Sequence, residues 1–148
     1  MALAEREASI HWEGDIKRGG GQVTMESSGA FGQFDISLPT RTGNPEGHTS
    51  PEELLAASHA GCYASALSLV LSKGGTPPES LDAHAVAVLD KVGDGLAVTR
   101  IDLSVHGKVS GLDQSSFEDA ARRAEQSCPI SNALRGNVDI NLEATLDQ

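Results

Sequence analysis

The feature that most constrains this chain is one apolar segment near its middle, residues 50–75, which reads SPEELLAASHAGCYASALSLVLSKGG. Ser50 is a favourable N-cap, Pro51 suits the first helical position, and Glu53 stands where a capping box needs an acid. Alanine and leucine then dominate as far as Leu71, before a pair of glycines and a pair of prolines end the pattern. Because this helix is apolar on most of its faces, we expect it to form the buried centre of the fold.

Short segments with alternating apolar residues surround this helix and predict strands. The expected strands are residues 9–15, 22–26 and 31–38 before the helix, and 82–91, 96–109 and 138–146 after it. We interpret residues 39–50 as a polar loop, residues 115–126 as a second helix and residues 130–134 as a short helical turn. The order βββ-α-ββ-α-β indicates an α+β fold, with antiparallel sheets around a long central helix. A chain of 148 residues is expected to form a single domain, residues 1–148.

The composition argues against several classes of function. With 11 basic and 21 acidic residues, the net charge of −10 opposes binding to nucleic acid and to anionic membranes. No uninterrupted apolar run reaches the ~18 residues typical of a membrane span, and the charged N-terminus does not resemble a signal peptide. We therefore expect a cytoplasmic protein.

The two cysteines, Cys62 and Cys128, are the residues best suited to carry chemistry. A structural disulfide is rare in a reducing compartment, and the lack of a C-x-x-C motif excludes the usual zinc-ribbon and thioredoxin spacings. A buried cysteine often serves only as a small apolar side chain, and this interpretation stays open for Cys62. A reactive Cys62 needs a nearby cation to favour its thiolate, and Arg41 in the preceding loop is a candidate. Cys128 precedes a proline that can open a helical turn, where the helix dipole favours a thiolate.

Of the two glutamates near the start of the helix, only one has an evident structural role. Glu53 has a structural role in the capping box, so Glu52 is the better candidate. Ten helical residues place Glu52 about 15 Å from Cys62, too far for contact within one helix. If the two residues meet, we expect them to do so across a homodimer in which antiparallel copies of this helix pack together.

His59 lies three residues before Cys62, on the same helical face. This pair permits a Cys–His nucleophile or half of a metal site, but no second pair of ligands is evident. We therefore expect His59 to pack in the core or to hydrogen-bond to backbone, and we expect no metal or cofactor.

Three stretches of the chain form a specific combination. They are HWEGDIKRGGGQV near the N-terminus, SPEELLAASHAGCYASALS around Cys62, and CPISNAL beginning at Cys128. Together they resemble the OsmC/Ohr family of osmotically inducible and organic hydroperoxide resistance proteins, and the first stretch is similar to the OsmC branch. The resemblance covers nearly the whole chain. It implies a tightly intertwined homodimer with two active sites at the interface.

The resemblance also implies an activity, that of a thiol-dependent peroxidase acting on organic hydroperoxides and, less well, on hydrogen peroxide. By position, Cys62 matches the peroxidatic cysteine, Cys128 the resolving cysteine, Arg41 the arginine that holds the thiolate, and Glu52 the acidic partner of that arginine. An external dithiol of the lipoyl or thioredoxin type is the implied reductant. From the residues alone, two alternatives stay open. They are a non-catalytic stress or small-ligand-binding protein with a buried Cys62, and a metal site at His59 and Cys62.

Overall fold

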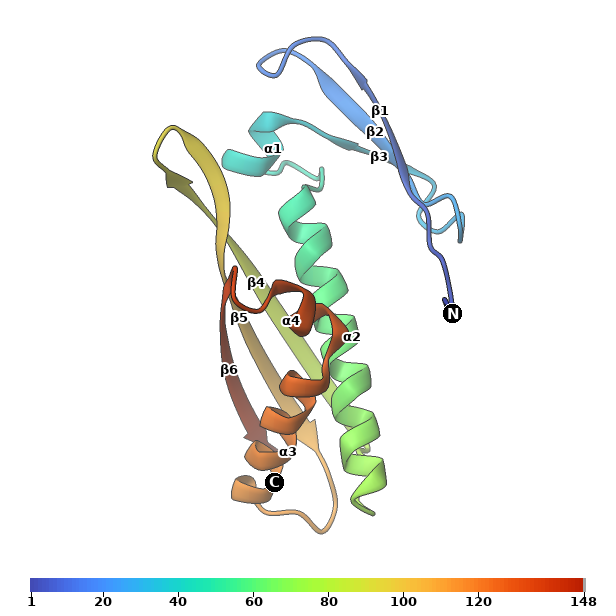
Figure 1. Cartoon of the computed structure of the whole chain (residues 1–148), viewed down its shortest axis with the longest axis vertical. Helices are drawn as coiled ribbons and strands as arrows, with labels where there is room; N and C mark the ends of the chain where they lie inside the picture. Colours follow the sequence, from blue (N-terminus) through green and yellow to red (C-terminus); the bar gives the residue numbers. More distant parts are fainter. Residues whose placement is uncertain (148) are drawn as a thin grey trace. The chain divides into compact units, whose positions relative to one another are not determined.

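The computed structural model describes residues 1–147 of the chain (Figure 1). It contains two compact units, one from Met1 to Leu54 and the other from Leu55 onward. The division falls inside the long helix α2 (Pro51–Lys73), so the first turn of α2 belongs to the N-terminal unit. The single domain expected from the length of the chain stays a prediction.

The N-terminal unit is built on a small antiparallel sheet in the order β1-β2-β3. Its strands are β1 (Ser9–Glu13), β2 (Gly20–Thr24) and β3 (Gln33–Ile36). Gly21 is opposite Trp12 in the register, and a Cβ atom at position 21 would lie 2.7–2.9 Å from side-chain atoms of Ile10 and Trp12. The glycine therefore lets these two apolar side chains cross the neighbouring strand.

The segment after β3 differs from the prediction. Residues 39–50 were expected to be a polar loop, but a short helix, α1 (Leu38–Thr42), occupies its beginning. The Thr40 hydroxyl accepts the Ser37 N–H (3.0 Å) and donates to the Ser37 carbonyl (2.9 Å), and a proline stands in the first turn. This local turn chemistry outweighs the polar composition of the segment, and it places Arg41 in the last turn of a helix.

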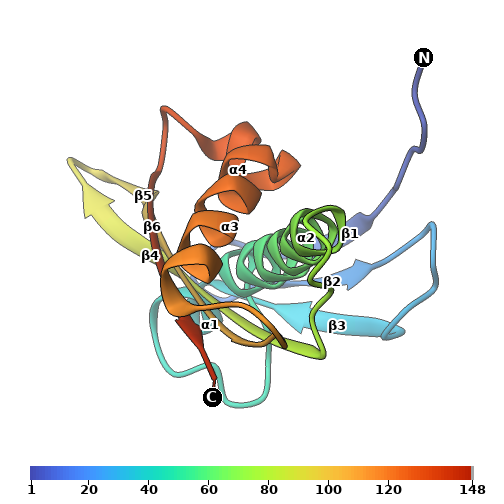
Figure 2. The ribbon, with the colours of Figure 1, turned by 90° about the horizontal axis from the view of Figure 1, so that it is seen from below.

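The C-terminal unit packs helices on one face of a three-stranded sheet in the order β4-β5-β6, as Figure 2 shows. Its elements are α2 from Leu55, β4 (Ser80–Val92), β5 (Gly95–Lys108), α3 (Gln114–Ser127), α4 (Pro129–Leu134) and β6 (Asp139–Leu146). Fully buried side chains of α2, including Tyr63 and Leu67, share one apolar cluster with Ile101 and Val105 of β5 and Phe117 of α3. Burial of large apolar side chains of this kind is the main favourable contribution to folding.

The prediction of purely antiparallel sheets was wrong for one pair of strands. β4 and β5 form the expected antiparallel hairpin, but β6 runs parallel to β5. The chain between β5 and β6 passes through α3 and α4, which return it to the same end of the sheet before the last strand begins. A crossover of this length is what a parallel pair requires.

Helix α2 is also long and apolar enough to cross a membrane when judged by length and composition alone. Polar residues are spread along α2, so it contains no uninterrupted apolar run of the length that a membrane span needs. Core helices of globular proteins meet the same criterion, and Tyr63, Leu67 and Leu71 of α2 lie in the core of the C-terminal unit. Because only 28% of the most apolar stretch of α2 is buried in a single chain, the prediction of a buried central helix is confirmed for this core face alone.

Candidate active site

The structure brings the two cysteines of the C-terminal unit together. Cys62, on α2, is half-buried and packs against the apolar cluster that contains the fully buried Cys128. Cys128 ends α3 and also begins α4, with Pro129 in the first turn of α4 as the sequence predicted. Both thiols are free, and the Cys128 thiol lies close enough to influence ionisation at Cys62.

Three neighbouring influences set the ionisation of Cys62. Burial raises the pKa of the Cys62 thiol, and the adjacent Cys128 thiol raises it further. The backbone N–H of Ile130, in the first turn of α4, acts in the opposite direction because it donates toward the sulfur. The net result is a pKa above that of an ordinary thiol. A Cys62 thiolate near neutral pH therefore requires a cation in addition to these groups.

The N-terminal unit contains a second pair of the predicted site residues. Arg41, at the end of α1, donates from Nε and Nη2 to the carboxylate of Glu52 at the start of α2, with a shortest distance of 2.7 Å. The Glu52 side chain is 10% exposed and the Arg41 side chain is 31% exposed. This two-pronged geometry fixes the guanidinium plane while leaving part of the arginine accessible.

The neighbouring glutamate shows one half of the predicted capping box, because its carboxylate accepts from Thr49 and not from the Ser50 backbone. The Glu53 N–H donates to the Ser50 hydroxyl (3.1 Å), so Ser50 caps α2. The carboxylate of Glu53 accepts the Thr49 hydroxyl (2.8 Å). Glu53 therefore interacts with residues at the N-terminus of α2, whereas Glu52 forms an ion pair with Arg41.

Glu52 is ionised despite its burial. Burial raises the pKa of Glu52, but hydrogen bonds from Arg41, from its own backbone N–H and from Ser50, together with the Arg41 charge, more than offset this effect. The pKa of Glu52 consequently lies below its ordinary value of 4.5, and the same pairing raises the pKa of Arg41. Both groups are charged at neutral pH.

This pairing predicts an acid-sensitive contribution to stability. Because the pKa of Glu52 is lowered on folding, its contribution is fully present above pH 4.5 and is lost as the pH falls through the lower folded value. Glu52→Gln should reduce the free energy of unfolding at neutral pH by about 1–2 kcal/mol, a range that allows for the partial exposure of Arg41. Urea titrations of both proteins at neutral pH and at about pH 3 should show this difference shrinking in acid.

A matched control for this prediction is Glu53→Gln. Its carboxylate is exposed and accepts only from Thr49 in the structure, so the variant should not reproduce the pH dependence. An equal loss of stability for Glu52→Gln at both pH values would show that the ion pair does not cause it.

His59 packs in the protein interior, which confirms one of the two predicted alternatives. It is fully buried, but its Nε2 bonds the Ser131 hydroxyl of α4 at 2.7 Å and not a backbone group. Its Nδ1 is buried without a partner, and burial lowers the pKa of the ring against the opposing charge of Glu125. Among residues 1–147, no cluster of three His, Cys, Asp or Glu side chains that could hold a metal is found. Sequence reasoning missed Ser131, because nothing in the sequence links it to a histidine 72 residues earlier.

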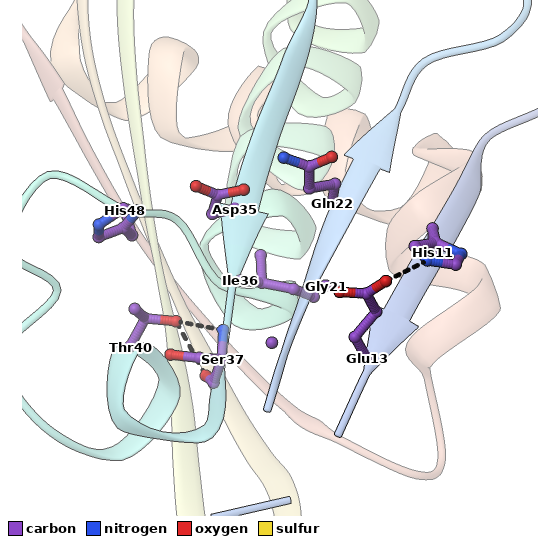
Figure 3. Close-up of a pocket in the computed structure, with 10 residues that line it drawn as sticks. His11, Glu13, Gly21, Gln22, Asp35, Ile36, Ser37, Thr40 and His48 are labelled. Atoms are coloured by element: carbon purple, nitrogen blue, oxygen red, sulfur yellow. Dashed lines mark hydrogen bonds and ion pairs between the residues drawn. The ribbon is translucent and has the colours of Figure 1, made fainter. Parts of the chain in front are cut away.

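The N-terminal unit also has a cavity of ≈ 450 Å³. Figure 3 shows His11 and Glu13 on one side of it, with Asp35 and His48 on the other. The His11 and Glu13 side chains are 3.3 Å apart and largely exposed to solvent, so their interaction adds little to stability. None of the four predicted site residues lines this cavity, so we do not assign the thiol chemistry to it.

Comparison with known proteins decides the family. A sequence profile described as OsmC-like protein matches residues 43–143. Peroxiredoxin OsmC of Escherichia coli (strain K12) is 41% identical over 138 residues, which cover 93% of this chain and 95% of that protein. The chain belongs to the OsmC family. The family also links it to the organic hydroperoxide resistance protein OhrB of Bacillus subtilis (strain 168), which is 32% identical over 126 residues and covers 85% of this chain and 91% of its own.

Solved structures of OsmC and Ohr proteins support the same assignment. The organic hydroperoxide resistance protein OsmC from Legionella pneumophila superimposes with a TM-score of 0.77 at 29% identity, covering 98% of this chain and 99% of its own. The OhrB structure from Bacillus subtilis gives a TM-score of 0.75 at 27% identity, covering 97% and 100%. These likenesses confirm the α+β fold class that the sequence predicted for this OsmC-family chain.

Proposed function

We propose that this chain is a thiol-dependent peroxidase of the cytoplasm that reduces organic hydroperoxides and, less well, hydrogen peroxide. The observation that carries the proposal is the placement of the half-buried Cys62 against the buried Cys128 in a chain of the OsmC family. Relatives of this chain are named peroxiredoxin and organic hydroperoxide resistance protein, which agrees with an oxidisable pair of thiols.

The reaction divides into three balanced steps. The Cys62 thiolate attacks one peroxide oxygen, the O–O bond breaks, and the alcohol leaves with a proton, giving a sulfenic acid. The Cys128 thiol then attacks the sulfenic sulfur, so that an S–S bond forms and water leaves. An external dithiol of the lipoyl or thioredoxin type reduces this disulfide by exchange and becomes oxidised itself. No cofactor or metal is needed in any step.

Arg41 and Glu52 are the proposed activating pair. The local surroundings of Cys62 raise its pKa, so the reaction needs a cation that stabilises the thiolate. Arg41 is held in a fixed orientation by Glu52 and keeps part of its side chain accessible, which suits a group that binds a thiolate or a peroxide oxygen. Glu52 orients Arg41 in this proposal and does not touch the peroxide.

The proposed assembly is an intertwined homodimer. Glu52 precedes Cys62 by ten residues on one continuous helix, a separation of about 15 Å. A second copy of the chain can supply an Arg41–Glu52 pair to Cys62 without bending the helix. Packing of two α2 helices would also cover the exposed apolar side chain of Leu69.

Mixing two inactive variants tests this assembly. Glu52→Ala chains retain Cys62, and Cys62→Ser chains retain Glu52, so a mixed dimer contains one site with both residues. Each variant alone should be nearly inactive, whereas unfolding and refolding them together should restore up to about a quarter of the wild-type activity if chains pair at random. Activity that stays at the sum of the two separate variants would argue against a site shared between chains.

Substrate preference tests the proposed function itself. Because Cys62 lies in apolar surroundings, an alkyl peroxide should gain binding energy that hydrogen peroxide lacks. With a dithiol reductant in excess, kcat/KM for tert-butyl hydroperoxide should exceed that for hydrogen peroxide by about tenfold or more. A chain that consumes neither peroxide would support the alternative of a non-catalytic, ligand-binding protein.

A further inference from the structure

The buried pair of His59 and Ser131 has no part in the steps described above. Both side chains are fully buried, and their hydrogen bond of 2.7 Å joins α2 to α4. The ring Nδ1 has no hydrogen-bond partner among residues 1–147, so only one of the two ring nitrogens is paired there. An apolar pair of similar size would avoid the cost of burying these polar groups, so stability alone does not explain the pair.

The hydrogen bond lies beside the two cysteines on both of its elements. His59 is three residues before Cys62 and shares its face of α2, while Ser131 is three residues after Cys128. Ser131 also directly follows Ile130, whose N–H donates toward the Cys62 sulfur. The bond therefore ties together the two elements that carry the thiols, about one helical turn from the sulfur atoms.

A second contact joins the end of α4 to α3. Arg135, at the end of α4, pairs with Glu125 near the end of α3 at 2.7 Å. The short segment from Cys128 to Leu134 is thus held by His59 of α2 and, through Arg135, by the largely buried Glu125 carboxylate of α3. Apolar contacts permit small shifts of such a segment, whereas a buried hydrogen bond fixes both distance and direction.

We propose that His59 and Ser131 are positioning residues for the resolving step. Their hydrogen bond holds α4 so that the Cys128 thiol faces the oxidised sulfur of Cys62 at the distance and angle that attack requires. Neither residue gains or loses electrons, and neither touches the peroxide. The inference rests on the proposed function, because it presupposes that Cys128 condenses with a Cys62 sulfenic acid.

The test follows disulfide closure separately from the first oxidation. Each reduced protein is mixed with one equivalent of cumene hydroperoxide, quenched with acid at increasing times, and the sulfenic, disulfide and sulfinic forms are counted by mass spectrometry. In Ser131→Ala and His59→Leu, Cys62 oxidation should stay within about threefold of wild type, whereas closure should slow by about tenfold or more. The sulfinic form should rise with added peroxide, because the sulfenic acid persists for longer.

Matched variants distinguish positioning from a general loss of packing. Glutamine places an amide group, which can donate or accept, near the position of histidine Nε2, so His59→Gln should recover most of the closure rate, whereas the shorter His59→Asn should not. Each single variant removes the same hydrogen bond between His59 and Ser131. The double variant His59→Leu/Ser131→Ala should therefore form the disulfide no more slowly than the slower single variant. Val105→Ala, a core truncation on β5, should lower stability without slowing closure.

The outcomes separate this inference from the proposed function. A wild-type protein that forms neither sulfenic acid nor disulfide would overturn both. Rapid closure in the wild type together with unchanged closure in Ser131→Ala and His59→Leu would overturn the positioning role alone. Equal slowing in Val105→Ala would overturn it as well, because loss of packing would then be sufficient. Ser131→Ala removes a single oxygen atom and keeps the test decisive if His59→Leu fails to fold.

Discussion

Replacement of Cys62 by serine is expected to abolish peroxide turnover, with a fall in kcat/KM of about 10³-fold or more. Serine keeps the size of the side chain, but its hydroxyl does not ionise near neutral pH and cannot be oxidised to a sulfenic acid. The half-buried site tolerates this change, so folding and stability should be close to those of wild type. Consumption of tert-butyl hydroperoxide in the presence of excess dithiol measures the effect.

A control at the surface makes the Cys62 result specific. Ser65→Ala alters an exposed residue one helical turn further along α2 and should leave turnover unchanged, although it removes a hydrogen bond to the Gly61 carbonyl. Substantial peroxide consumption by Cys62→Ser would assign the chemistry to another group. The interpretation of Cys62 as a small apolar side chain would then be preferred.

Replacement of Cys128 by serine should produce a different defect, which separates the two thiols by role. The first oxidation of Cys62 should continue at a rate within about threefold of wild type, because Cys128 does not attack the peroxide. Steady-state turnover should fall by about tenfold or more, since reduction of the sulfenic acid then depends on its slower reaction with an external thiol. Repeated additions of peroxide should inactivate this variant through sulfinic acid formation at Cys62.

The contrast between the two variants is measured by single-turnover oxidation followed by mass spectrometry. Cys128→Ser should accumulate the sulfenic form after one equivalent of peroxide, whereas wild type should accumulate the disulfide. If Cys128→Ser turned over peroxide as fast as wild type and resisted repeated additions of peroxide, Cys128 would not be the resolving cysteine. Loss of the first oxidation would instead assign Cys128 a direct part in activating Cys62.

Much of the fold could be predicted because its signals are local. The N-cap at Ser50, the proline after it and the glycines after Lys73 define the ends of α2 within two residues of the prediction. The strand predicted at residues 138–146 is present as β6, and its alternating apolar residues Ile140, Leu142 and Ala144 are half-buried. Capping groups and alternating apolar residues act over a few positions, so a single sequence contains the necessary information.

The features that the sequence did not predict depend on distant contacts or on competing local chemistry. The parallel direction of β6 follows from how α3 and α4 cross the sheet, which no local pattern shows. Helix α1 forms in a polar segment because the Ser37–Thr40 bonds outweigh its composition. The raised pKa of Cys62 results from burial and from the Cys128 thiol 66 residues away, against the lowering effect of the Ile130 N–H, and no local pattern shows these influences.

The residues of the candidate site also divide into those that the sequence indicated and those that only the tertiary structure shows. Family resemblance, and not spacing, singled out Arg41 and Cys128 as partners of Glu52 and Cys62. The structure places Arg41 against Glu52 and Cys128 against Cys62, while the roles of all four remain proposals. The His59–Ser131 bond needed the tertiary structure, since it joins residues 72 positions apart.

The most direct test of peroxide reduction by Cys62 and Cys128 is mass spectrometry under non-reducing conditions, after one equivalent of cumene hydroperoxide. The intact chain is expected to lose the mass of two hydrogen atoms, and one linked peptide pair is expected to contain Cys62 and Cys128. Sulfinic acid at Cys62 with a free Cys128 thiol, or two unmodified thiols after exposure to the peroxide, would contradict this mechanism.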